Sequence, residues 1–158
     1  VMGIDTEPGL AFVKSQLAAG VRLPKSGKAF LSVRDEDKPR AVEIGRTLVG
    51  LGFALVATKG TAAALEAAGL AVQLVNKVQE GRPNVVDMIR NREISLIINT
   101  VEEDRRSVRD SWSIRNSALQ GRVTYYTTVS GARAACVGMQ YIEELRPYDL
   151  QGLHATIR

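Results

Sequence analysis

Four consecutive residues, Thr58-Lys59-Gly60-Thr61, combine the residue types that bind a phosphate group. They follow an apolar run of strand length and precede an alanine-rich stretch of helical length. A turn of this kind points unpaired backbone N–H groups and the positive end of a helix at one position. Gly60 lets an anion approach the backbone, and the two threonine hydroxyls add hydrogen-bond donors. The same residues also fit an ordinary helix cap with a turn glycine, so both interpretations stay open at this point.

Lys38, Lys77 and Asn99 each follow a different predicted strand and could contribute to the same site. The lysines supply positive charge, and an asparagine amide can donate to and accept from a ribose, a base or a phosphate. Each also has a simpler interpretation, as a solvated lysine or as a turn residue at the end of a strand. Ligands bind outside the carboxyl ends of the strands in open α/β sheets. Together with Thr58 and Thr61, these residues therefore predict an anion-binding pocket.

The sequence contains few of the groups on which catalysis depends. The single histidine, His154, lies close to the end of the chain and is expected to be solvated. The single cysteine, Cys136, falls on the apolar face of a predicted helix and is expected to be packed rather than nucleophilic. No group of cysteine, histidine and carboxylate residues has the spacing of metal ligands, and neither a histidine nor an obvious aspartate lies near the predicted strand ends. We therefore expect no catalytic residue and no metal site in this chain.

The composition narrows the class of protein. The chain has 158 residues, of which 45% are apolar and 24% charged, which is typical of a globular domain and excludes a disordered chain. The net charge of +4 would suit nucleic acid, but acidic and basic residues are interleaved and only 5% of residues are aromatic. No apolar run approaches the length of a membrane span, and a single cysteine favours a reducing compartment. We therefore expect a cytoplasmic domain that binds neither nucleic acid nor a membrane.

Short apolar runs alternate with helical patterns along the chain, which is typical of an α/β fold. Strands are predicted over residues 29–33, 53–57, 71–75, 94–99 and 123–127. Helices are predicted over residues 7–19, 37–49, 62–68, 104–120 and 130–145, with a short one after Asn84. The predicted architecture is a three-layer sandwich with a mostly parallel, five-stranded sheet covered on both faces. Residues 1–27 are expected to form a helix and connector, and residues 28–158 the α/β domain.

Several residues are predicted to mark the ends and faces of these helices. Asp37 and Asn84 are candidate N-caps, and Gly69 suits the left-handed position after a helix. The helix over 104–120 presents an apolar stripe of Val108, Ser111, Ile114, Ala118 and Leu119, with Arg115 near its centre. The tail, residues 147–158, is expected to be a surface loop that ends in a short extended piece.

Seven segments in order carry a family resemblance: Leu31-Ser32-Val33-Arg34, Ala57-Thr58-Lys59-Gly60-Thr61, Leu74-Val75-Asn76-Lys77-Val78, Glu80-Gly81-Arg82-Pro83, Ile97-Ile98-Asn99-Thr100, Ile114-Arg115 and Ser117-Ala118-Leu119-Gln120. The series closely resembles the C-terminal allosteric domain of the carbamoyl-phosphate synthase large subunit. That domain has the methylglyoxal-synthase-like fold, a Rossmann-like α/β fold. The resemblance extends from Val1 to at least Met139 and therefore covers nearly the whole chain.

The resemblance implies a regulatory domain without catalytic residues of its own. In the family this domain binds UMP, which inhibits the synthase, and in some members IMP, which activates it. By motif position the nucleotide site comprises Ser32, Lys38, Thr58, Gly60, Thr61, Lys77, Asn99 and Thr100. Tyr125 and Thr127 are this domain's expected share of an ornithine site, which acidic residues of another part of the subunit would complete.

The resemblance also implies a larger protein around this chain. Residues 1–27 resemble the stretch that joins the preceding synthetase domain to the allosteric domain, so Val1 is expected to lie inside a longer chain. The parent enzyme would be an ATP-dependent ligase that uses ATP with Mg²⁺ or Mn²⁺ and K⁺, with no cofactor in this domain. Its expected partners are the rest of the large subunit, a small glutaminase subunit and further copies in an oligomer. The carbamoyl phosphate would serve pyrimidine and arginine synthesis.

Three departures from the family pattern leave the choice and affinity of the effector open, one of them a longer and more acidic loop at Glu102-Glu103-Asp104. The sign of regulation is open as well, because it depends on coupling to domains outside this chain. Val101 stands where a second threonine is familiar, and Lys59 stands where a histidine is familiar. The alternative function is that of an enzyme with the same fold, a methylglyoxal synthase or an IMP cyclohydrolase. A methylglyoxal synthase uses an aspartate and a histidine near the strand ends, and the sequence suggests neither at these positions.

Overall fold

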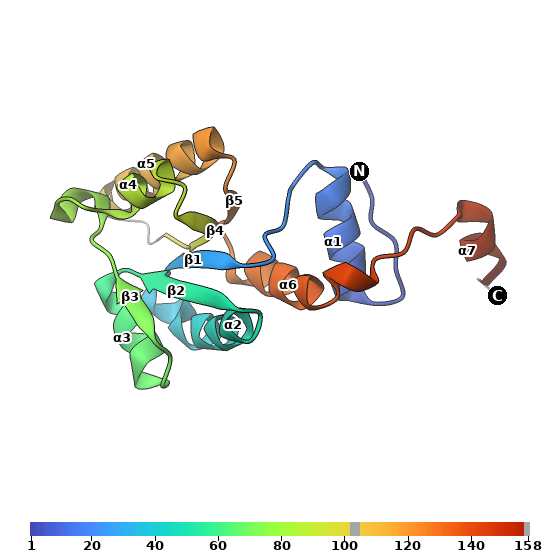
Figure 1. Ribbon diagram of the computed structural model, residues 1–158, viewed down its shortest axis with the longest axis horizontal. Helices are drawn as coiled ribbons and strands as arrows, with labels where there is room; N and C mark the ends of the chain where they lie inside the picture. Colours follow the sequence, from blue (N-terminus) through green and yellow to red (C-terminus); the bar gives the residue numbers. More distant parts are fainter. Residues whose placement is uncertain (102–104, 157–158) are drawn as a thin grey trace.

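The fold is built on one sheet of five parallel strands in the order β3-β2-β1-β4-β5 (Figure 1). The computed structural model describes residues 1–101 and 105–156. The strands are β1 (Gly27–Ser32), β2 (Phe53–Ala57), β3 (Val72–Leu74), β4 (Ile94–Asn99) and β5 (Thr124–Tyr126). The chain runs outward from β1 to β3 and then returns to place β4 on the other side of β1. The order of the strands therefore reverses between β1 and β4, which is where open α/β sheets bind ligands.

Helices cover both faces of the sheet, so the predicted three-layer α/β architecture is confirmed (Figure 1). One layer contains α2 (Lys38–Gly50), α3 (Lys59–Ala67) and α6 (Val129–Gln140), with α1 (Pro8–Ala18) packed against α6. The other contains α4 (Val85–Arg90) and α5 (Arg105–Gly121). Three short 3-10 turns are η1 (Asp35–Asp37), η2 (Val78–Glu80) and η3 (Ile142–Glu144). Within the described residues every strand pair is parallel, which is more regular than the mostly parallel sheet we predicted.

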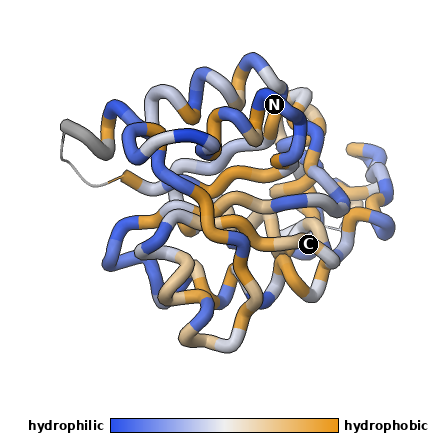
Figure 2. Tube along the Cα trace, turned by 60° about the vertical axis from the view of Figure 1, so that its left-hand side comes forward, coloured by the Kyte–Doolittle hydropathy of each residue, from blue (hydrophilic) through white to orange (hydrophobic). Residues whose placement is uncertain are grey.

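The middle residues of the two central strands, residues 29–31 in β1 and 96–98 in β4, are apolar because both faces of the sheet are buried there (Figure 2). In β4, Leu96 and Ile98 pack beneath α2 and α6, whereas Ile97 packs beneath α4 and α5. Successive side chains of a strand point to opposite faces, and each face is covered here by a helical layer. The apolar runs that predicted the strands are thus a direct result of the three-layer arrangement.

The helix ends agree with the sequence at two of three predicted positions. The Asn84 side chain accepts hydrogen bonds from Val86 N–H at 3.0 Å and from Asp87 N–H, and Gly69 adopts a φ of +80°. Asp37 is the exception, because its side chain does not cap α2. Its backbone already belongs to the turn η1, and its buried carboxylate instead accepts from Arg34 Nε at 2.8 Å. A cap residue needs an extended backbone, whereas the turn before α2 gives Asp37 a helical one.

The C-terminal part differs most from the prediction. The expected extended piece is wrong, because residues Leu150–Thr156 form the helix α7, which projects from the main body (Figure 1). Asp149 Oδ1 accepts a hydrogen bond from Gly152 N–H at 2.6 Å and so stabilises the first turn. The helix predicted over 130–145 ends at Gln140 and continues only as η3. Asp104, the predicted start of the preceding helix, lies outside the described residues.

α1 packs tightly onto α6 through two glycines. A Cβ atom on Gly138 would lie 2.1 Å from Val13 Cγ2 and 2.7 Å from the carbonyl oxygen of Gly9, both on α1. Val13 is fully buried and belongs to the main core. The boundary between residues 27 and 28 stays a prediction, although α1 shares a core with the α/β domain.

Gly138→Ala should lower the free energy of unfolding by about 1–3 kcal/mol, because the added methyl group must separate α1 from α6. This cost opposes the roughly 1 kcal/mol that alanine would gain by helix propensity. Gly50→Ala is the matched control, since a Cβ there meets no atom within 4 Å. Urea unfolding followed by circular dichroism measures both variants. Equal stability of the two variants would contradict a close contact between the helices.

Candidate functional site

A cavity of about 230 Å³ lies at the carboxyl ends of β1, β2 and β4. All eight residues predicted for a nucleotide site line it: Ser32, Lys38, Thr58, Gly60, Thr61, Lys77, Asn99 and Thr100. The pairing of Ser32 with Asn99 and of Leu31 with Ala57 ends these three strands at a common edge. The sheet therefore brings together residues that are 68 positions apart in the chain. That they bind a nucleotide stays a prediction.

The amino end of α3 forms the floor of the cavity. Thr58 precedes the helix with an extended backbone, but its hydroxyl lies 3.2 Å from the Ser32 hydroxyl and does not cap α3. The Thr61 hydroxyl accepts a hydrogen bond from Val33 N–H at 3.1 Å. No described side chain accepts from the first N–H groups of α3, and such groups bind the oxygens of an anion. The helix end therefore has the donors that an anion requires, and that it binds one stays a prediction.

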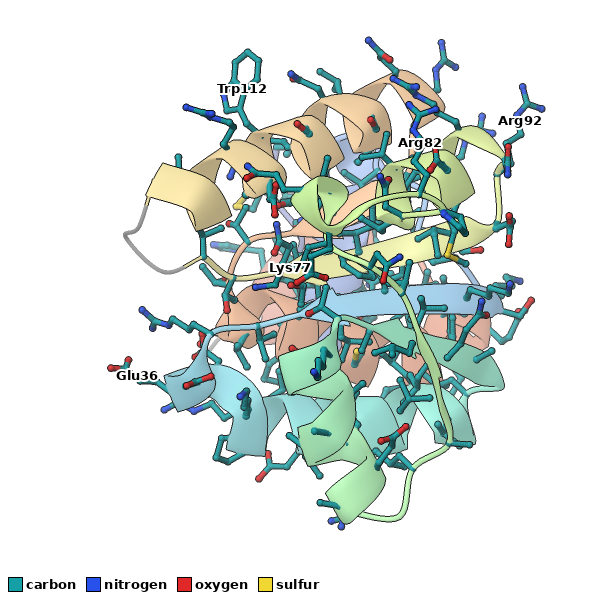
Figure 3. All side chains as sticks on the ribbon, turned by 90° about the vertical axis from the view of Figure 1, so that its left-hand side faces the viewer. Glu36, Lys77, Arg82, Arg92 and Trp112 are labelled. Carbon is teal, nitrogen blue, oxygen red and sulfur yellow. The ribbon has the colours of Figure 1, made fainter. Side chains whose placement is uncertain are left out.

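Two lysines add positive charge at the same place. A Cβ on Gly60 would lie 3.5 Å from Lys38 Nζ, so the Lys38 ammonium stands over the amino end of α3. Lys38 Nζ also pairs with Asp35 Oδ1 at 2.7 Å. Figure 3 looks onto this edge and shows Lys77 between the two helical layers. The hydrogen bond and the charge of Lys38, and more weakly the charge of Lys77, hold the pKa of Asp35 below its usual value of 3.8.

The opposite wall is made of buried polar groups and apolar side chains. The Asn99 side-chain nitrogen donates to the Tyr125 hydroxyl at 3.0 Å and to the Ser111 hydroxyl at 3.1 Å. These two bonds fix the orientation of the amide. Apolar surface comes from Val78, Val85, Val101 and Ile114. The cavity therefore has a cationic end and a mixed polar and apolar end.

The two residues expected at an ornithine site lie in different surroundings. Tyr125 contacts the wall of the cavity through Asn99. Thr127 lines a neighbouring cavity of about 260 Å³ together with Thr128 and Arg40, and Tyr125 does not line it. Thr100 lines both cavities, so they adjoin. An ornithine role for Tyr125 and Thr127 stays a prediction.

Two acidic residues of the cavity are not among the predicted site residues. Asp35 and Asp110 both line it, although we expected no obvious aspartate near the strand ends. Asp35 follows the first strand by three residues, and that position alone could have revealed it.

Asp110 was not predicted at the cavity because the apolar stripe that we assigned to the buried face of α5 is partly wrong. Val108 and Leu119, placed in the apolar stripe, are 49% and 79% exposed. Arg115 is exposed as well and stands over the Tyr125 ring at 5.7 Å. Ser111, Ile114 and Ala118 are buried as predicted, and Asp110 lies beside them.

The other reactive residues lie away from the cavity. Cys136 is buried in α6, and burial raises its pKa to about 12, so it is packed as predicted and not a thiolate. His154 is exposed on α7. Among the residues that the structure describes, no three histidine, cysteine, aspartate or glutamate side chains cluster in a way that could hold a metal ion. None of the described helices is long and apolar enough to cross a membrane.

Comparison with known proteins identifies both a domain family and long relatives. The family model described as MGS-like domain matches residues 40–127. The carbamoyl phosphate synthase large chain of Ralstonia nicotianae is 56% identical over 157 residues, which are 99% of this chain and 14% of the relative. The corresponding large chain of Pseudomonas putida is 51% identical over 158 residues, or 100% of this chain and 15% of the relative. The chain thus spans about one seventh of the length of these relatives.

Thr61→Val should lower the free energy of unfolding by about 1–3 kcal/mol, because it leaves the buried Val33 N–H without its acceptor. Thr47→Val is the matched control: its hydroxyl donates only to a carbonyl within α2, at 3.2 Å. The control should stay within about 0.5 kcal/mol of the unmodified chain. Urea unfolding of both variants measures the difference. An unaffected Thr61→Val variant would show that this hydroxyl does not support the β1 loop.

Proposed function

Because the chain belongs to the MGS-like domain family, we propose that it is the regulatory domain of a carbamoyl phosphate synthase large chain and binds nucleoside monophosphates. One observation carries the proposal: Lys38, Lys77 and the amino end of α3 converge on one cavity at the reversal of strand order. The assignment to this synthase is supported by the 51–56% sequence identity with the large chains, which extends over essentially the whole of this chain.

The cationic end of the cavity suits a phosphate group. Backbone N–H groups at a helix start hold phosphate oxygens, and a lysine ammonium adds a charge-assisted hydrogen bond. Lys38 stands over the helix start and Lys77 faces it from the loop after β3. Thr58 and Ser32 add hydroxyl groups beside this point. A phosphate monoester would therefore be held by charge and by directional donors together.

The other end of the cavity suits a nucleoside. Asn99 and Ser111 offer polar groups, and the Asp110 carboxylate can accept hydrogen bonds from ribose hydroxyls. Val85 and Ile114 provide apolar surface for a base. UMP and IMP are the effectors we propose, because the family domain that this chain resembles binds UMP as an inhibitor and, in some members, IMP as an activator. Val101 gives the cavity one hydroxyl fewer than a threonine would, whereas Lys59 is exposed and does not line it.

The domain acts on the synthase through parts that lie outside this chain. In the proposed assembly the rest of the large subunit completes an ornithine site with Tyr125 and Thr127. The small glutaminase subunit, the oligomer, and the sites for ATP, Mg²⁺ or Mn²⁺ and K⁺ belong to the whole cytoplasmic enzyme. Effector binding and the active state of that enzyme would be coupled reciprocally, typically by about 1–3 kcal/mol.

UMP should bind the chain saturably in isothermal titration calorimetry, and uridine should bind much more weakly because it lacks the phosphate. Lys38→Ala and Lys77→Ala should each weaken UMP binding about tenfold or more, as expected for loss of a charge-assisted hydrogen bond. Lys25→Ala is the control, since Lys25 is exposed, pairs with Glu143 and does not line the cavity. No saturable binding of UMP or IMP at millimolar concentration would refute the proposal.

The alternative function, a methylglyoxal synthase or IMP cyclohydrolase activity, gains support from Asp35 and Asp110 in the cavity. His154, however, lies on α7 and does not line the cavity. We expect no methylglyoxal above background when the chain is incubated with dihydroxyacetone phosphate. Production of methylglyoxal that Asp110→Asn abolishes would establish the enzyme instead.

A further inference from the structure

The side chain of Asp35 lies beside Lys38, where we expect the phosphate to bind. Asp35 Oδ1 lies 2.7 Å from Lys38 Nζ, and the Asp35 side chain lines the same cavity as Lys77. Lys38 Nζ is the cation that stands over the amino end of α3. A carboxylate of the chain therefore already pairs with one of the two lysines at the cationic end of the cavity.

The contact between Asp35 and Lys38 can be broken at low cost. The Asp35 side chain is 82% exposed and that of Lys38 is 27% exposed, and such ion pairs are weak because water screens them. Asp35 nevertheless remains ionised at neutral pH, since the two lysines lower its pKa further. A phosphate carries up to two negative charges and three acceptor oxygens, so it competes well with a single carboxylate.

The turn that carries Asp35 is held independently of this pair. Asp37 is buried and accepts from Arg34 Nε at 2.8 Å. The Arg34 backbone N–H donates to Thr100 Oγ1 at 3.1 Å. The side chain of Asp35 can therefore leave Lys38 while η1 stays in place.

We propose that Asp35 is a resident counter-ion that an incoming phosphate must displace from Lys38, and that it thereby sets the affinity of the cavity. The inference rests on the proposed function, in that it takes the phosphate to bind beside Lys38. Asp35 weakens binding because each effector molecule must first separate the ion pair. Asp35 also favours dianionic phosphates. A singly charged ligand carries no more negative charge than the carboxylate that it replaces, so its electrostatic attraction to Lys38 is no stronger.

The neighbouring Glu36 provides a matched control. It belongs to the same turn and its side chain is equally exposed, but it lies 3.8 Å from the Arg34 guanidinium and does not line the cavity. Figure 3 shows Glu36 pointing outward from this edge. Asp35→Asn and Glu36→Gln each remove one negative charge from η1, and only the first removes the partner of Lys38.

Calorimetric titration of the full chain and both variants with UMP, inorganic phosphate and uridine tests the proposal. Asp35→Asn should tighten the binding of UMP and of phosphate roughly two- to fivefold. Glu36→Gln should leave both affinities nearly unchanged, and uridine should bind all three proteins alike. In a Lys38→Gln background the gain from Asp35→Asn should disappear, because the two substitutions remove one interaction.

The possible outcomes separate the two proposals. Unchanged or weaker UMP and phosphate binding by Asp35→Asn would overturn the counter-ion role while leaving the proposed function intact. An equal gain with uridine, or with Glu36→Gln, would overturn it as well, since the effect would not concern the phosphate or Lys38. Absence of UMP and phosphate binding in the unmodified chain and in Asp35→Asn would refute both proposals.

Discussion

The pairing of β1 with β2 on one side and with β4 on the other is the constraint on which the rest of the structure depends. Parallel backbone hydrogen bonding ends these strands at one edge, with Leu31 opposite Ala57 and Ser32 opposite Asn99. The polar residues that follow these three strands therefore lie at the same edge of the sheet. The helices that cover both faces exclude water from the sheet, and the cavity lies at its uncovered carboxyl edge.

The hydroxyl groups of the cavity also hold its loops together. The Thr61 hydroxyl accepts a hydrogen bond from Val33 N–H, and the Thr100 hydroxyl accepts one from Arg34 N–H. The Ser32 and Thr58 hydroxyl groups are hydrogen-bonded to each other. These bonds tie the loop after β1 to its neighbours on both sides. The loop that carries Asp35 and Lys38 is thus held by the same hydroxyl groups that would contact a ligand. These groups would therefore serve both ligand binding and the local stability of the loop.

The fold and most of the cavity could be predicted because their signals are local. An apolar strand followed at once by a polar residue is visible in the sequence, and the parallel topology then places that residue at the site, as for Asn99. Asp110 could not be found in this way, because it sits inside a helix whose exposed side also carries apolar residues such as Leu119. The conformations of Asp37 and of α7 depend on a preceding turn and on a single capping bond, which residue pattern alone does not resolve.

The glycine contact between α1 and α6 has a mechanical consequence. Gly138 lies directly against the Val13 side chain and the Gly9 carbonyl group of α1, so this close contact leaves little room for one helix to shift against the other. The first two residues of α6, Val129 and Ser130, line the second cavity, and α1 lies near the beginning of the chain. A displacement of α6 at its amino end would therefore move α1 together with it, as one rigid unit.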